Sequence, residues 1–181
     1  MNMKLKPQEM DRLGLEDFRS SDKFPLILIA DNIRSGNNIG SLFRSSDALR
    51  TEAVYLCGIS AKPPHRDIQK TALGATESVE WQYFENTVDA VAQAREKGYK
   101  VYALEQTRDS ILLNDFRPSS DAKIAIVLGN EVRGVDQKVI DDCDGVIEIP
   151  QFGTKHSFNV SVSAGIILWD LFTKIRPFES L

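Results

Sequence analysis

Three polar segments hold the side chains that could do chemistry, and each follows directly after a short apolar run. These segments are residues 31–38, 129–134 and 150–159, after the apolar runs 26–30, 124–128 and 147–149. Polar side chains contribute little to core packing, so a cluster of them where a buried strand meets a helix indicates a functional site. In open parallel sheets, ligands bind beyond the carboxyl ends of the strands, where backbone N–H groups at helix starts are free. We therefore expect the three segments to meet at one edge of a sheet.

Several common site chemistries lack a motif in this chain. The first segment has no G-x-G-x-x-G dinucleotide fingerprint, and there is no G-x-x-x-x-G-K-[ST] phosphate loop. His65 and His156 stand far from any Cys or second His at ligand spacing, so no metal site is expected. The pair His156-Ser157 could suggest a hydrolase, but adjacent residues rarely point at one another and the G-x-S-x-G elbow is missing.

Strand-like and helix-like runs alternate along the chain and must position the three segments. The predicted strands are residues 26–30, 53–57, 78–84, 100–104, 124–128 and 146–149, and the predicted helices are 38–49, 66–73, 86–97, 135–142 and 159–175. Strands of continuous Val, Ile and Leu that alternate with helices predict an α/β fold, with a mostly parallel sheet covered by helices on both faces. Residues 1–22 are charged and predict an arm or short helix outside a single domain of residues 23–181.

The composition is that of an ordinary globular protein with a substantial core. The chain has 181 residues, of which 42% are hydrophobic and 27% charged. No apolar run is long enough for a transmembrane helix, and the N-terminus lacks the apolar part of a signal peptide. Cys57 and Cys143 are far apart without a CxxC spacing, so reduced structural thiols and a cytoplasmic location are expected.

The net charge of −4 is unevenly distributed. Residues 1–70 hold eleven Lys and Arg against nine Asp and Glu, whereas residues 71–181 hold eleven against seventeen. A basic face on the N-terminal half, suited to nucleic acid, is therefore one interpretation, and ordinary solvated charge is the other.

The predicted helix 159–175 has apolar residues on nearly all sides, whereas a terminal helix of a small domain should have one polar face exposed to solvent. Burial against a second subunit would explain this pattern and predicts a homodimer. On this hypothesis Ile167 and Leu171 lie in the interface, and a glutamate at either position would disrupt the dimer.

The three polar segments resemble the three motifs of the SpoU group of the SPOUT RNA ribose 2′-O-methyltransferases. The matching stretches are residues 38–48, residues 126–134, and Ile149-Pro150 followed by residues 157–161. Their order and separation agree from about residue 24 to residue 175, and three motifs in register are far more specific than one. Two positions depart from the group: Phe158 stands where leucine is usual, and Val132 replaces a common small residue.

The resemblance implies a C-terminal trefoil knot, which is an exception to the rule that chains are not knotted. It also implies S-adenosylmethionine as cofactor, a dimer, and transfer of a methyl group to a ribose 2′-hydroxyl of RNA. The arginine that matches Arg44 is commonly proposed as the base in this group. A guanidinium stays protonated at ordinary pH, so Arg44 is better suited to grip a phosphate and orient the hydroxyl.

The remaining roles also come from the resemblance. Glu131 would organise Arg44 or the substrate-facing loop, and Ser157 and Asn159 would lie at the active centre. The alternatives are structural: helix N-capping for Asn38, Ser157 and Asn159, and stabilisation of a helix N-terminus for Glu131. The expected cofactor-binding residues are Leu104, Gly129, Ile149, Gln151, Ser157 and Phe158, and the expected substrate-binding residues are Asn38, Arg44, Lys155 and His156.

Two alternatives stay open at this point. The substrate could be tRNA or rRNA, and tRNA is favoured because small members of the group often act there. The protein could also be an RNA-binding module without activity, although Arg44, Glu131, Ser157 and Asn159 are all present.

Overall fold

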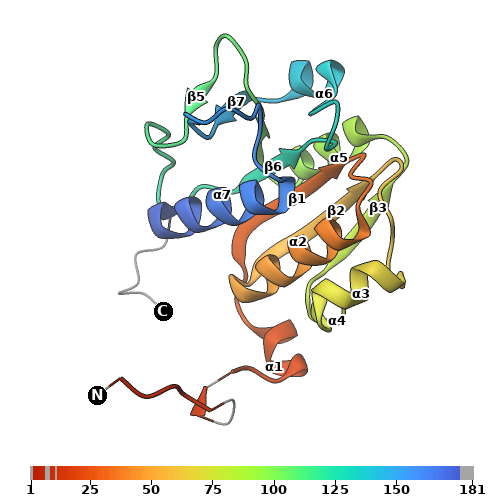
Figure 1. Ribbon diagram of the computed structural model, residues 1–181, viewed down its shortest axis with the longest axis vertical. Coiled ribbons are helices and arrows are strands. Elements are labelled where there is room, and N and C mark those ends of the chain that lie inside the picture. The colour runs from red at the N-terminus through yellow and green to blue at the C-terminus, as the bar shows by residue number, and fades with distance from the viewer. Residues whose placement is uncertain (1, 7–8, 11, 176–181) are drawn as a thin grey trace.

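Seven parallel strands form one sheet in the part of the chain that the structure describes. That structure is a computed structural model, and it describes residues 2–6, 9–10 and 12–175 (Figure 1). The sheet has the order β3-β2-β1-β6-β4-β7-β5. The strands are β1 (Phe24–Asp31), β2 (Thr51–Cys57), β3 (Trp81–Phe84), β4 (Lys100–Leu104), β5 (Ile111–Leu112), β6 (Ile124–Leu128) and β7 (Gly145–Glu148).

The strand order brings the three polar segments to one edge of the sheet, as predicted. β1 pairs with β6 up to Ala30 and Leu128, and β4 pairs with β6 up to Leu104 and Leu128. β7 then lies beside β4, with Ile147 opposite Leu104. Because neighbouring strands are parallel, their carboxyl ends lie side by side, and so do the segments that follow them.

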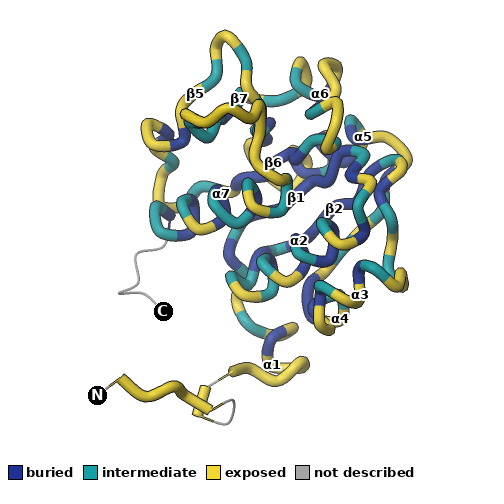
Figure 2. The backbone as a smooth tube through the Cα atoms, viewed as in Figure 1, coloured by how far each residue is buried: buried dark blue, intermediate teal, exposed yellow. Residues whose placement is uncertain are grey.

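Helices cover both faces of the sheet, which confirms the predicted fold class. One face packs α1 (Leu15–Ser20), α2 (Gly36–Ala48), α3 (Arg66–Ala72), α4 (Ala75–Ser78) and α7 (Val160–Ile175), and the other packs α5 (Thr87–Glu96) and α6 (Gln137–Asp142). Successive strand residues point to opposite faces. In β1, Leu26 and Leu28 therefore join the first core, whereas Ile27 and Ile29 join the second. Figure 2 shows these strands as the buried interior of the molecule.

Most predicted elements are present, with ends that differ by a few residues. The prediction of a strand over 78–84 was wrong at its start, because Ser78 belongs to α4. Its hydroxyl donates to the carbonyl of Ala75 at 3.2 Å and also bonds the carboxylate of Asp47, which holds this turn against α2. The two-residue strand β5 was not predicted, since both of its residues are exposed and too few to show a period.

The last helix, α7, does have a buried side within its own chain. Ile167 and Leu171 are fully buried in the core beside α2 and the sheet, so the prediction that they form a subunit interface was wrong. The exposed side of α7 is nevertheless apolar, with Val162 49% exposed and Trp169 53% exposed. No helix in the described ranges is long and apolar enough to cross a membrane.

Both cysteines are free thiols that contribute to packing. Cys57 ends β2 and is buried, and Cys143 caps the carboxyl end of α6. Burial raises the pKa of each thiol to about 12, so both are protonated at neutral pH and are poor nucleophiles.

Candidate active site

A cleft of about 680 Å³ opens at the carboxyl ends of β4, β6 and β7. Apolar side chains from these strand ends and from α7 line it, and polar side chains from the three neighbouring loops surround it. The apolar lining includes Leu104, Leu128, Ile149, Phe158 and Val160, and the polar lining includes Glu105, Gln106, Asn130, Gln151 and Ser157. An apolar slot with a few polar groups and free backbone amides suits a small organic ligand.

The wall of this cleft is a tight turn that requires glycine at its start. Asn130 and Gly134 pair through two backbone hydrogen bonds of 3.0 and 2.9 Å, so the chain folds back immediately after β6. A Cβ atom on Gly129 would lie 2.2 Å from the backbone carbon of Gly134 and 2.2 Å from the backbone nitrogen of Val135. Any side chain at position 129 would therefore displace the wall of the cleft.

Glu131 connects this turn to the first polar segment. Its carboxylate accepts hydrogen bonds from the backbone N–H groups of Arg34 and Ser35, each at 3.0 Å, and from the amide of Asn38 at 3.0 Å. Burial alone would raise the pKa of Glu131, but these hydrogen bonds outweigh it and hold the pKa below its usual value of 4.5. The ionised form therefore fastens the second segment to the first.

We expect Glu131→Gln to remove a pH-dependent part of the stability. A carboxylate with a lowered pKa in the folded state stabilises the fold at pH values above 4.5, and this stabilisation is lost as the pH falls through the lowered value. The difference in unfolding free energy between wild type and variant should thus be constant at neutral pH and shrink in acid. Urea unfolding across a pH series measures it. Glu85→Gln, at an exposed glutamate after β3, is the matched control and gives the effect of removing one surface carboxylate at each pH.

Asn38 and Asn159 join the first segment to the third. The amide of Asn159 donates to the side-chain oxygen of Asn38 at 3.2 Å, while Asn38 itself bonds Glu131. The structural alternative for Asn38, helix N-capping, does not hold, because Ser35 is the N-cap of α2 and accepts from the backbone N–H of Asn38. Asn159 does act at the start of α7, where it accepts from the backbone N–H of Ser161 at 2.9 Å. One hydrogen-bonded network therefore spans all three segments.

The other predicted site residues divide into two groups. Every predicted cofactor-binding residue lines the cleft, and so does His156. Lys155 and Arg44 do not line it. Arg44 lies exposed on α2, and its guanidinium makes no hydrogen bond or ion pair with the described residues.

Three of the cleft residues that were not predicted, Glu105, Gln106 and Asn130, make hydrogen bonds between loops. The carboxylate of Glu105 accepts from the backbone N–H groups of Gln106 at 2.8 Å and Val135 at 3.1 Å, and Gln106 donates to the carbonyl of His156 at 2.8 Å. Asn130 donates to the carbonyl of Asn32 at 2.7 Å. These contacts join the cleft-forming loops to one another. Glu105 and Gln106 directly follow the predicted strand 100–104, so the polar-after-strand signal used elsewhere would have found them.

The described residues include no group of three or more His, Cys, Asp or Glu side chains that could hold a metal ion. The chemistry available at this site is that of a cleft for an organic ligand beside a network of amides, the carboxylates of Glu105 and Glu131, and the exposed Arg44.

The sequence and the fold match known methyltransferases. The sequence profile of the SpoU rRNA Methylase family matches residues 25–169, so the chain belongs to this family. A 23S rRNA (guanosine-2′-O-)-methyltransferase, RlmB of Neisseria meningitidis serogroup B, is 33% identical over 144 residues, which are 80% of this chain and 56% of that protein. The chain thus spans little more than half the length of this curated relative.

Two solved structures share the fold. The TrmH/SpoU tRNA modifying enzyme of A. aeolicus has a TM-score of 0.76 and 25% identity, covering 88% of this chain and 81% of that one. A structure described as giving insights into the 2-OH methylation of C/U34 on tRNA has a TM-score of 0.73 and 20% identity. It covers 84% of this chain and 98% of that one, and it supports the fold alone.

Proposed function

We propose that this protein is an S-adenosylmethionine-dependent RNA methyltransferase that modifies a ribose 2′-hydroxyl. The observation that carries the proposal is the network of Glu131, Asn38 and Asn159, which joins the three family motifs beside one cleft. A binding module without activity would not need this arrangement next to a small-molecule cleft.

The cleft residues fit the proposed cofactor. Its volume of about 680 Å³ lies within the range of about 300–1,000 Å³ typical of small-molecule sites. Leu104, Ile149 and Phe158 would hold the adenine in an apolar slot, with Gly129 and Gln151 offering backbone groups at the rim. When bound, S-adenosylmethionine would supply an activated methyl group on its sulfonium. We propose that the reaction needs no metal ion.

The chain's own residues would position the RNA. Arg44 would grip a phosphate of the RNA with its planar fork and orient the neighbouring 2′-hydroxyl toward the cleft, and the proton of that hydroxyl would pass to the phosphate or to solvent. Glu131 would hold the first segment in place, and Asn38 and Asn159 would fix the approach of α7. The exposed hydroxyl of Ser157 lies at the cleft mouth, where it can contact the ribose.

We propose tRNA as the substrate and rRNA as the alternative. The match to the A. aeolicus tRNA modifying enzyme covers most of both chains, whereas RlmB is matched over only 56% of its length. The proposed site of action is the cytoplasm, where RNA is accessible and Cys57 and Cys143 stay reduced.

The test is transfer of labelled methyl groups to unmodified tRNA and rRNA pools, followed by mass spectrometry of the digested nucleosides. A 2′-O-methylated nucleoside from tRNA is the expected product. A methylated base would overturn the reaction assignment, and a product from rRNA alone would overturn the substrate. Binding of RNA and cofactor without any transfer would favour an inactive binding module.

We further propose a homodimer that buries the exposed side of α7. Val162 and Trp169 are about half exposed in the single chain, and such apolar groups on one helix are typical of an interface. This surface replaces the one first predicted, because Ile167 and Leu171 belong to the core.

Val162→Glu should convert the dimer into folded monomers, because it places an unpaired charge in the proposed interface. Sedimentation velocity measures the change. Leu73→Glu, at an exposed leucine that ends α3, is the control and should stay dimeric. A wild-type monomer, or a dimer that survives Val162→Glu, would contradict this interface.

A further inference from the structure

Four basic side chains lie on neighbouring loops beside the candidate site, on the side away from the cleft. Arg34 belongs to the loop after β1, and Lys62, His65 and Arg66 belong to the loop after β2 and the start of α3. β1 and β2 pair up to Asp31 and Cys57, so the two loops leave the sheet side by side. We call these four residues the basic loop surface.

Hydrogen bonds fix the two loops relative to each other. The buried hydroxyl of Ser60 donates to the carbonyl of Ala30 at 3.2 Å and accepts from the backbone N–H of Ile33 at 2.9 Å. The side-chain oxygen of Asn32 accepts from the backbone N–H of Ile59 at 3.1 Å. The loop after β2 is therefore hydrogen-bonded to Ile33, the residue that precedes Arg34.

The packing of α2 against α3 brings His65 close to the first segment. A Cβ atom on Gly36 would lie 3.1 Å from Nδ1 of His65 and 3.1 Å from Cβ of Asp67. Gly36 is the first residue of α2, and α2 also carries Asn38 and Arg44. The basic loop surface therefore packs against the start of α2, the helix that carries Asn38 and Arg44.

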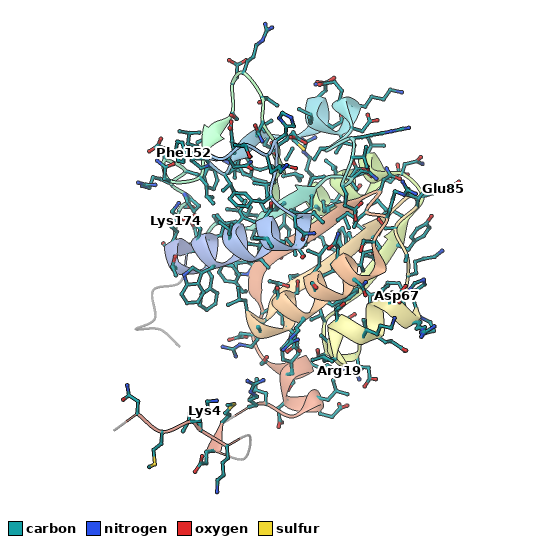
Figure 3. All side chains as sticks on the ribbon, viewed as in Figure 1. Lys4, Arg19, Asp67, Glu85, Phe152 and Lys174 are labelled. Atoms are coloured by element: carbon teal, nitrogen blue, oxygen red, sulfur yellow. The ribbon has the colours of Figure 1, made fainter. Side chains whose placement is uncertain are left out.

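The arginine and lysine side chains of this surface form no salt bridge with described residues, although the carboxylate of Glu131 accepts from the backbone N–H of Arg34 at 3.0 Å. All four side chains are exposed; the ammonium of Lys62 lies over the ring of Tyr83 at 3.9 Å, and Nδ1 of His65 accepts from the backbone N–H of Asp67 at 3.2 Å. Asp67 is the only acid in residues 58–70, and it pairs with Lys70 at 2.8 Å. Figure 3 labels Asp67 on α3 and also Glu85, which follows the edge strand β3.

We propose that the basic loop surface binds backbone phosphates of the RNA whose ribose is methylated. This inference rests on the proposed function, and it adds a path for the strand, which would run from the cleft mouth across Arg34 to the loop after β2. Phosphate contacts fix the register of a nucleic acid, and arginine forks suit them in geometry. The chain carries a net charge of −4, so such contacts need a local basic surface. Ile59, 64% exposed in the same loop, offers an apolar contact for a sugar or base.

The test compares RNA affinity over a series of salt concentrations for wild type and for the double variant Arg34→Gln/Arg66→Gln. The probe is unmodified bulk tRNA, and fluorescence anisotropy gives the affinity. We expect tenfold or greater weakening at low salt. The slope of log affinity against log salt should fall by about one to two, since each phosphate contact contributes about 0.7–0.9. Calorimetry should show unchanged binding of S-adenosylmethionine, because neither side chain lines the cleft.

The matched control is Lys100→Gln/Lys123→Gln, which removes two exposed charges at the amino ends of β4 and β6, the opposite edge of the sheet. Its affinity and slope should equal those of wild type. An unchanged slope in the arginine variant would overturn the inference while leaving the proposed function intact. Equal losses of RNA affinity in both variants would also overturn it, because the loss would then follow from net charge and not from this surface. A wild-type protein that binds no RNA would overturn both.

Discussion

The Arg44→Ala variant is expected to fold, to bind S-adenosylmethionine as the wild type does, and to lose methyl transfer on the order of a hundredfold or more. The reason is its position: Arg44 is exposed on α2, outside the cleft and without a hydrogen-bond partner among the described residues. Its removal should leave the cofactor site intact and delete a group that we propose acts on the RNA in the transition state. Single-turnover transfer of labelled methyl to tRNA, with parallel cofactor titration, measures both quantities.

Arg44→Lys should restore little of the lost activity, because one ammonium cannot reproduce two parallel hydrogen bonds to a phosphate. Arg50→Ala, at a nearby arginine after α2 that belongs to no motif, is the control and should retain transfer. Wild-type activity in Arg44→Ala would remove this residue from the mechanism. A parallel loss of cofactor binding would instead show that Arg44 acts through the cleft.

Gly129→Val is expected to abolish binding of S-adenosylmethionine. Even the first side-chain atom would lie 2.2 Å from the backbone of Gly134 and Val135, so the turn that walls the cleft must move. Calorimetric titration should show no binding, while circular dichroism and the unfolding transition report whether the fold persists.

Gly153→Val is the matched control, because a Cβ atom there would meet no described atom within 4 Å. It should bind cofactor normally. If Gly129→Val folded and still bound S-adenosylmethionine, the cleft assignment would be wrong. If it failed to fold, Gly129→Ala, which adds only the Cβ atom, would serve in its place with the same expected loss of binding.

The sequence alone was sufficient for the fold class and for the edge of the sheet that carries the site. Buried parallel strands such as residues 100–104 and 124–128 are read directly from continuous apolar runs, because both of their faces must be covered. Polar residues after such strands mark the carboxyl edge, which is why residues 31–38, 129–134 and 150–159 were predicted to meet there, whereas the cofactor-binding roles of Gly129, Ile149 and Ser157 came from the resemblance to the SpoU group. The trefoil knot stays a prediction, since strand order does not establish the path of the chain through its own loops.

What the local pattern could not provide was the partner of each side chain. Asparagine is a residue type common at helix N-caps. The amide of Asn38 nevertheless donates to Glu131, 93 positions away, because β1 and β6 are neighbours in the sheet. The apolar residues of α7 could face a second subunit or the core, and only the packing against α2 and the sheet placed Ile167 and Leu171 inside. The periodicity of apolar residues indicates that a side chain is shielded from water. Only the tertiary structure decides whether the core or another subunit shields that side chain.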